Sequence, residues 1–268
     1  MLRLPAVAGR FYPDDPEELT ALVRECAEPS PGTKPERVRA CLVPHAGYKF
    51  SGHVAGAVFS RIALPHKIVI LGVRHFPRGQ TLSVLSSGAW RTPLGDAPID
   101  VALASALQKE CPIIREDAVA HSAEHSIEVQ IPFLQVLSPE FAFVPIALGT
   151  VRFEDLVAVG EALARILAAN PEVLLVTTSD LNHYEDDATT RAKDKKAIEQ
   201  ILALDPRGLY DTCTNERISM CGLGPTVAML VALRALNAKR ADLIRHATSA
   251  DVSGDTSSVV GYAGFIFS

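Results

Sequence analysis

Three strand-like runs in this sequence are followed at once by side chains that can bind metals or move protons. His45 follows CLVP, His75 follows VILGVR, and Asp180 with His183 follows LVTTS. A lone histidine at a strand end is usually structural. In an open α/β sheet, however, ligands bind beside the carboxyl ends of the strands, where side chains distant in sequence converge. Three strand ends of the same kind therefore favour one shared site.

Cys221 precedes a helical segment that Pro225 helps to start. A thiol near a helix N-terminus has its thiolate favoured by the helix dipole, so this cysteine could serve as a soft ligand or a nucleophile. The alternative is a small core residue, which is the commonest fate of a free cysteine. The other four cysteines lie in helix or strand patterns or in a plain loop, and we expect them to be structural.

Two neutral imidazoles and one anionic ligand form a facial set that leaves positions open, as in non-haem Fe(II) enzymes. A thiolate as the anionic ligand shifts the preference towards copper or zinc. Beside such a site, His183 would act as a general acid or base, since an unperturbed imidazole titrates near about pH 6.5. Asp180, three residues earlier, would orient it.

The segment HSAEHSIEVQIPFL contains H-x-x-E-H, the inverted zinc-peptidase motif, at 121–125. That motif needs both histidines on one face of an established helix, whereas Ser122 and Ser126 resemble capping residues near a helix start. We therefore favour a structural role, in which His125 and Glu128 stabilise the first turn. A role for these residues behind the ligands or in a pocket wall stays open.

Hydrophobic patterning predicts the elements that must position these residues. Strands are expected at Val38–Val43, Lys67–Leu71, Phe141–Leu148, Glu172–Thr178 and Val259–Phe267. Helices are expected from Asp15 to about Cys26 and at Gly52–Ile62, Val101–Lys109, Ser126–Leu137, Phe153–Ala168, Ala188–Leu204 and Pro225–Leu236. Because strand and helix alternate, the fold class expected is α/β, with a central sheet flanked by helices in one layered domain.

Composition narrows the class of protein. The 268 residues, 48% of them hydrophobic, suit a single domain spanning residues 1–268. A formal net charge of −5 without a basic stripe argues against nucleic-acid binding. Pro5 interrupts any N-terminal signal-like run, and no run reaches membrane-spanning length. Five scattered cysteines without a CxxC pair suit reduced thiols, so we expect a cytosolic protein.

Several of these segments together resemble the MEMO family. The matching boxes, in chain order, are AGRFYP, PHAGYKFSGHVAG, ILGVRHF, AWRTPLGD, EHSIEVQIPFL, SDLNHY, a Cys-Gly pair before the late helix, and GDTSSVVGYAG. They run from residue 8 to the final strand and so cover nearly the whole chain. The family is similar in fold to class III extradiol ring-cleavage dioxygenases, whose iron is held by two histidines and a glutamate.

The resemblance implies that His45, His75 and Cys221 occupy the ligand positions of one mononuclear metal, and that His183 with Asp180 occupies the catalytic-histidine region. Members of the family are described as binding copper or iron with redox activity, and zinc is a further possibility for this donor set. The animal form is described as a phosphotyrosine-peptide-binding effector. Microbial members often accompany a radical-SAM protein and a third partner.

Three positions depart from the family pattern. Where the family commonly has Gly-Pro before the strand-end histidine, this chain has Gly72-Val73-Arg74, so we expect a bulky cation beside His75 that could repel a metal or bind an anionic substrate. Phe50 replaces the second tyrosine of the PHAGY box, and Phe11 replaces the tryptophan of the animal protein. The phosphopeptide activity therefore does not transfer safely.

Two hypotheses follow for the function. The first is a metal-dependent, dioxygenase-like oxidoreductase whose substrate pocket includes Phe11, Tyr48, Phe50, Arg74 and His125. The second is a non-catalytic binding module that holds an anionic peptide or metabolite in the same pocket through Arg74 and the histidines. Fold alone does not decide between them.

Overall fold

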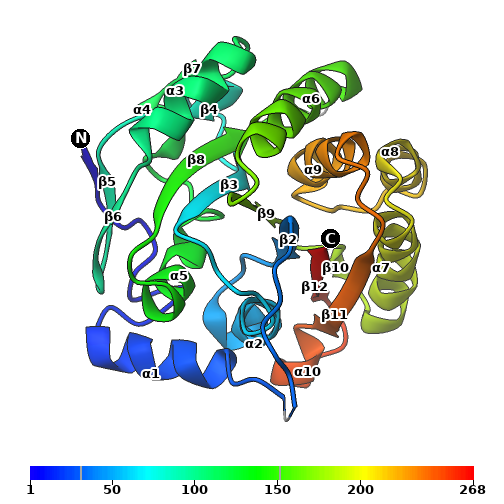
Figure 1. Cartoon of the computed structure of the whole chain (residues 1–268). Coiled ribbons are helices and arrows are strands. Elements are labelled where there is room, and N and C mark those ends of the chain that lie inside the picture. Colours follow the sequence, from blue (N-terminus) through cyan, green and yellow to red (C-terminus); the bar gives the residue numbers. More distant parts are fainter. Residues whose placement is uncertain (31, 151) are drawn as a thin grey trace.

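A computed structural model describes residues 1–30, 32–150 and 152–268, in which strands and helices are interspersed along the chain (Figure 1). The strands are β1 (Leu2–Arg3), β2 (Ala40–Val43), β3 (Lys67–Val73), β4 (Leu82–Val84), β5 (Ala89–Thr92), β6 (Gly95–Pro98), β7 (Arg115–Glu116), β8 (Ala142–Leu148), β9 (Leu174–Thr178), β10 (His183–Glu185), β11 (Ala241–Thr248) and β12 (Val259–Phe267). The helices are α1 (Pro16–Cys26), α2 (Tyr48–Phe59), α3 (Val101–Glu110), α4 (Ala118–His121), α5 (Ile131–Leu137), α6 (Phe153–Ala169), α7 (Asp187–Leu202), α8 (Pro206–Asn215), α9 (Leu223–Ala235) and α10 (Ala250–Ser253). A short 3-10 helix, η1 (Glu128–Gln130), precedes α5.

A mixed central sheet organises the molecule. Its strand order is β10-β12-β2-β9-β3-β8-β4-β7, and β11 pairs with β12 on the side of this path. Strands β2, β9, β3 and β8 are mutually parallel, whereas β12 and β4 run antiparallel to their neighbours β2 and β8. A second, small sheet has the order β1-β5-β6. The carboxyl ends of β2, β9 and β3 consequently lie side by side at one edge of the central sheet.

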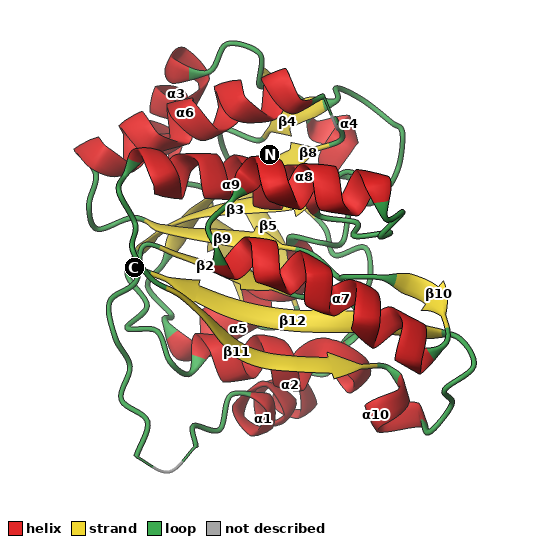
Figure 2. Cartoon of the chain, turned by 90° about the vertical axis from the view of Figure 1, so that its right-hand side faces the viewer, coloured by secondary structure: helices red, strands yellow, loops and turns green. Residues whose placement is uncertain are grey.

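Helices cover both faces of this sheet (Figure 2). Alternate residues of the central strands point to opposite faces. In β3, for example, Val69 and Leu71 pack with α3, α6 and α9, while Ile68 and Ile70 pack with α1, α2 and α5. The central strands are therefore buried on both sides, which explains why they read as continuous apolar runs. The expected α/β class, a central sheet flanked by helices, is confirmed.

Some boundaries differ from the expectation, for local reasons. Helix α1 begins as predicted, with the Asp15 side chain accepting hydrogen bonds from two backbone N–H groups of the first turn. Helix α2 begins at Tyr48 rather than Gly52, because the Tyr48 N–H bonds the carbonyl of Phe11 outside the helix. The single helix expected over Ser126–Leu137 is instead divided into η1 and α5.

Strand β11 and helix α8 are the longest elements that were not predicted, and the short elements β1, β4, β5, β6, β7, β10, α4 and α10 were not predicted either. Within the described residues, no helix is long and apolar enough to span a bilayer.

Candidate metal centre and catalytic cavity

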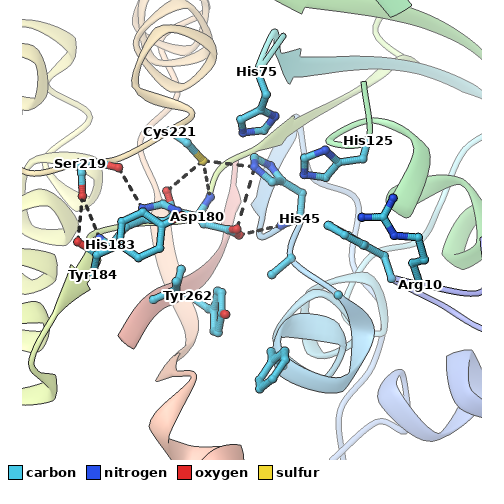
Figure 3. A pocket seen from close by; sticks show the side chains of 15 residues that line it. Arg10, His45, His75, His125, Asp180, His183, Tyr184, Ser219, Cys221 and Tyr262 are labelled. Atoms are coloured by element: carbon cyan, nitrogen blue, oxygen red, sulfur yellow. Dashed lines mark hydrogen bonds and ion pairs between the residues drawn. The ribbon is translucent and has the colours of Figure 1, made fainter. Parts of the chain in front are cut away.

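A cavity of about 650 Å³ opens at the carboxyl edge of the central sheet (Figure 3). Its lining residues are Arg10, Phe11, His45, Ala46, Gly47, Phe50, His75, His125, Asp180, His183, Tyr184, Ser219, Cys221, Val260 and Tyr262. The register explains the convergence, since Val43 of β2 lies beside Thr178 of β9, and Leu71 of β3 lies beside Thr177. The segments that leave these three strands therefore meet, as the strand-end argument expected.

His45 is the most deeply placed of the cavity histidines, with 1% of its surface exposed. Its backbone N–H donates to Asp180 Oδ1 at 2.8 Å, and its ring Nδ1 lies 2.9 Å from Thr178 Oγ1. Burial, followed by electrostatic repulsion from the neighbouring His75, lowers the pKa of His45 to about 3. His45 is thus a neutral imidazole near pH 7, and its Nε2 faces Cys221 Sγ at 3.2 Å.

His75 is oriented by Glu124, which is fully buried. One carboxylate oxygen lies 2.9 Å from His75 Nδ1, and the other accepts the His75 backbone N–H at 2.7 Å. The first oxygen also accepts the N–H groups of His125 and Ser126. Burial alone would raise the pKa of Glu124, but the hydrogen bond and charge of His75 outweigh it and lower the pKa to about 2. A buried carboxylate is therefore held ionised behind this ring.

Cys221 lies one residue before Gly222, the N-cap of α9, and its Sγ accepts the backbone N–H of Asp180 at 3.3 Å. A Cβ at position 222 would collide with Thr178 O and Ser179, so glycine is what allows this turn to pack against the end of β9. Burial, reinforced by the charge of Asp180, raises the pKa of the Cys221 thiol. Desolvation in the cavity therefore opposes the helix dipole, which by itself would favour the thiolate.

Among the described residues, three overlapping groups of donor atoms could each hold a metal ion, and within each group the atoms lie within 4.8 Å of one another. They are His45 with His75 and Cys221; His75 with Glu124 and His125; and Asp180 with His183 and Cys221. The first group contains the three residues that the family resemblance implied as ligands. His75 and Cys221 are each shared by two groups, so the cavity offers one crowded donor cluster.

His183 is positioned by Ser219 and not, as expected, by Asp180. Its backbone N–H donates to Ser219 Oγ at 2.8 Å, and its ring Nδ1 lies 3.0 Å from the Ser219 carbonyl. A carbonyl only accepts, so Nδ1 carries the proton and a neutral His183 has its lone pair on Nε2. The Asp180 carboxylate instead turns towards His45, whose N–H it accepts.

Two of the expected pocket residues lie elsewhere, whereas Phe11, Phe50 and His125 do line the cavity. Tyr48 is buried in the core, where its hydroxyl donates to the Val129 carbonyl at 2.6 Å. The Arg74 side chain turns away to donate to the carbonyls of Arg78 and Gly79. The expectation that Arg74 places a cation beside His75 in the cavity is therefore wrong.

The H-x-x-E-H segment does not form the two-histidine face of a zinc peptidase. Helix α4 ends at His121, whose buried ring lies against Ser83 Oγ at 3.3 Å, and among the described residues no metal-binding group includes it. Ser126 caps no helix, since its hydroxyl bonds Val73 of β3. Glu128 likewise binds the N-terminal segment rather than stabilising a first turn. Of the residues in this segment, His125 lines the cavity, which is the alternative role considered for it above.

Four lining residues with charged or polar side chains were not predicted from the sequence: Arg10, Tyr184, Ser219 and Tyr262. Tyr184 and Ser219 adjoin predicted residues in sequence, so proximity to His183 and Cys221 was an available signal. Arg10 and Tyr262 lie in the family boxes AGRFYP and GDTSSVVGYAG, which were an available signal, although neither box carries a chemical motif of its own.

The family model described as Memo-like protein matches residues 3–266. This chain belongs to the MEMO family. A MEMO1 family protein of Methanopyrus kandleri is 42% identical over 280 residues, covering 100% of this chain and 99% of that protein. One from Thermotoga maritima is 41% identical over 278 residues, covering 98% of each. An uncharacterized Escherichia coli K12 protein of known structure shares the fold, with a TM-score of 0.56 and 14% identity over 85% of this chain and 99% of its own.

Proposed function

We propose that this MEMO-family protein is a metal-dependent oxidoreductase with a dioxygenase-like site, in which His45, His75 and Cys221 hold one mononuclear iron or copper ion. The observation that carries the proposal is the arrangement of these three donors, whose atoms lie within 4.8 Å of one another. Two ligands of one first-row metal stand roughly 3–4 Å apart. The 3.2 Å between His45 Nε2 and Cys221 Sγ fits that requirement.

The surroundings of both histidines support the same donor set. Metal-binding histidines usually engage their second ring nitrogen with a protein group, which fixes the ring. Here Thr178 contacts Nδ1 of His45, and Glu124 contacts Nδ1 of His75, so Nε2 of each ring is left for a cation. Glu124 itself suits a supporting role better than a ligand role, because its two oxygens already accept four hydrogen bonds.

When bound, iron or copper would supply redox chemistry and Lewis acidity at open coordination positions. The chain's own residues would then orient the substrate and move its proton. His183, fixed by Ser219 with its lone pair on Nε2, would accept a proton from the substrate as a general base. Asp180 would hold the His45 loop in place through the His45 N–H.

Elemental analysis of protein purified anaerobically, without metal-affinity resin, tests the ligand assignment. We expect near-stoichiometric iron or copper in the wild type, and its loss in both His45→Ala and Cys221→Ala. His66→Ala and Cys26→Ser are matched controls, since neither side chain lines the cavity. Full metal occupancy in Cys221→Ala would refute the assignment.

The competing proposal, a non-catalytic binding module, loses Arg74 as its anion contact because that side chain lies outside the cavity. Arg10 takes its place as a cationic lining residue. Absence of metal from the wild type, even after reconstitution with Fe(II) or Cu(II), would favour the module.

A further inference from the structure

Among the described residues that line the cavity, Arg10 is the only one with a permanent positive charge. In the part of the chain that the structure describes, its exposed guanidinium makes neither a hydrogen bond nor an ion pair. Arg3 and Arg74, by contrast, are committed to protein oxygens. Arg10 is therefore a cation at the cavity that has no partner among the described residues.

The turn that carries Arg10 is fixed in place. The backbone N–H groups of residues 10 and 11 both donate to the Val7 carbonyl, at 3.1 and 2.9 Å, and Gly9 adopts a positive φ of 73°. Beneath the turn, the fully buried Glu128 accepts the N–H groups of residues 6 and 7 and the hydroxyl of Tyr12. The backbone of Arg10 is thus held at the cavity before any ligand binds, so that binding has to order only the side chain.

Ring contacts connect this turn to the metal-binding histidines. The Phe11 ring lies 4.8 Å from that of His125, which stacks on His75 with 4.7 Å between ring centroids. Figure 3 shows Arg10 on the opposite side of the cavity from His183. A ligand that touches Arg10 with one end can therefore reach the donor cluster with the other.

We propose that the cavity takes a small organic acid with an apolar body of about one ring, and that Arg10 is the specificity-determining residue that binds its acid group. The planar guanidinium can pair with a carboxylate or a phosphate through two parallel hydrogen bonds. Phe11, Phe50 and Tyr262 supply apolar walls, and the volume of about 650 Å³ suits a small molecule. The inference rests on the proposed function, because it names the substrate class of that same cavity.

Binding of benzoate, phenyl phosphate and the neutral benzamide to the full chain tests this inference. Binding is measured by isothermal titration calorimetry. The protein is first treated with a chelator, so that no metal can coordinate the probe directly. The variants are Arg10→Gln and, as a control, Arg37→Gln, which removes an equal charge from an exposed residue outside the cavity.

We expect at least one of the two acids to bind the wild type more tightly than benzamide does. Arg10→Gln should weaken the binding of that acid about five- to tenfold. Arg37→Gln should change neither the affinity for the acid nor the affinity for benzamide. The two acid probes distinguish a carboxylate from a phosphate. The inference is overturned if neither acid binds the wild type, if benzamide binds equally well, or if Arg10→Gln leaves acid binding unchanged.

Metal content measured on the same proteins separates this inference from the proposed function. Arg10 is not among the donor groups, so Arg10→Gln should load as much metal as the wild type. A wild type that binds benzoate but never loads metal would refute the oxidoreductase while supporting acid recognition by Arg10.

Discussion

The carboxylate of Glu128 gives the sharpest prediction about stability, because it is fully buried and holds the N-terminal segment to the rest of the fold. Its oxygens accept Arg3 Nη1 at 2.6 Å, Tyr12 Oη at 2.7 Å, and the backbone N–H groups of Ala6 and Val7 at 2.9 and 3.0 Å. Substitution by glutamine keeps the shape of the side chain. It removes the negative charge and turns an acceptor oxygen into a donor.

Glu128→Gln should lower the free energy of unfolding by about 3–5 kcal/mol, the usual cost of leaving one partner of a buried ion pair uncompensated. Arg3 is the partner that loses its counter-charge, and it is only 7% exposed. Arg3 also lies over Trp90, with 4.0 Å from its guanidinium carbon to the ring centroid. Trp90 is the sole tryptophan of the chain, so its fluorescence reports unfolding next to the altered pair.

Urea titrations followed by Trp90 fluorescence and by far-UV circular dichroism measure this loss. Glu25→Gln, at an exposed position, is the control and should change the free energy of unfolding by less than about 0.5 kcal/mol. Hydrogen exchange should show faster exchange of the amides at residues 6–12 in Glu128→Gln. A loss below about 1 kcal/mol, or unchanged exchange at those amides, would refute the view that the buried pair anchors the N-terminal segment.

Three further predictions concern the ligand shell and acid stability. Glu124→Gln should weaken metal affinity about 10- to 100-fold by loosening His75, as measured by competition with a chelator. Gly72→Ala should also reduce metal loading, since a Cβ there would collide with Ile127 and move the end of β3. His121 is buried and its pKa is lowered to about 4, chiefly by burial and then by the charge of Arg3. The stability contributed by neutral His121 is present above about pH 6.5, the pKa in the unfolded chain, and is lost at about 1.4 kcal/mol per pH unit as the pH falls towards 4. In urea titrations at pH 7 and pH 5.5, His121→Gln should therefore lose less free energy of unfolding between the two pH values than the wild type does.

Each of these has a result that contradicts it. Equal metal affinity in Glu124→Gln and in an exposed Glu154→Gln control would show that the carboxylate does not support the ligand. Normal metal loading in Gly72→Ala would mean that β3 adapts to the extra methyl group. An identical acid-induced loss of stability in wild type and His121→Gln would assign that loss to other groups.

The central strands and the strand-end histidines were predictable from sequence because both depend on local patterns. Buried parallel strands appear as uninterrupted apolar runs, and His45 and His75 directly follow two of them. Strand β11, which pairs with β12 at the side of the sheet, was missed because its sequence, ADLIRHAT, mixes charged and apolar side chains. Helix α8 was missed although Asp205 and Pro206 repeat the start signal of α1.

The hydrogen-bond partners of the site were not predictable, because they come from segments far away in sequence. Glu124 lies 49 residues from His75, and Ser219 lies 36 residues from His183. The Cys221 thiol illustrates the same limit. Its place before a helix was visible in the sequence, whereas its desolvation depends on how the whole cavity packs.

The segment from Glu124 to Glu128 connects the two halves of the cavity. Glu124 holds His75, a proposed metal ligand, while Glu128, one turn later, holds the turn that presents Arg10. Both carboxylates are fully buried, and Arg3 bonds the carboxylate of Glu128 and the backbone carbonyl of Glu124 at once, each at 2.6 Å. The spacing between the proposed metal and the proposed acid-binding residue is therefore set by one short, buried segment. This explains how a stretch that resembles a zinc-peptidase motif can support the cavity from both sides without its first histidine reaching it.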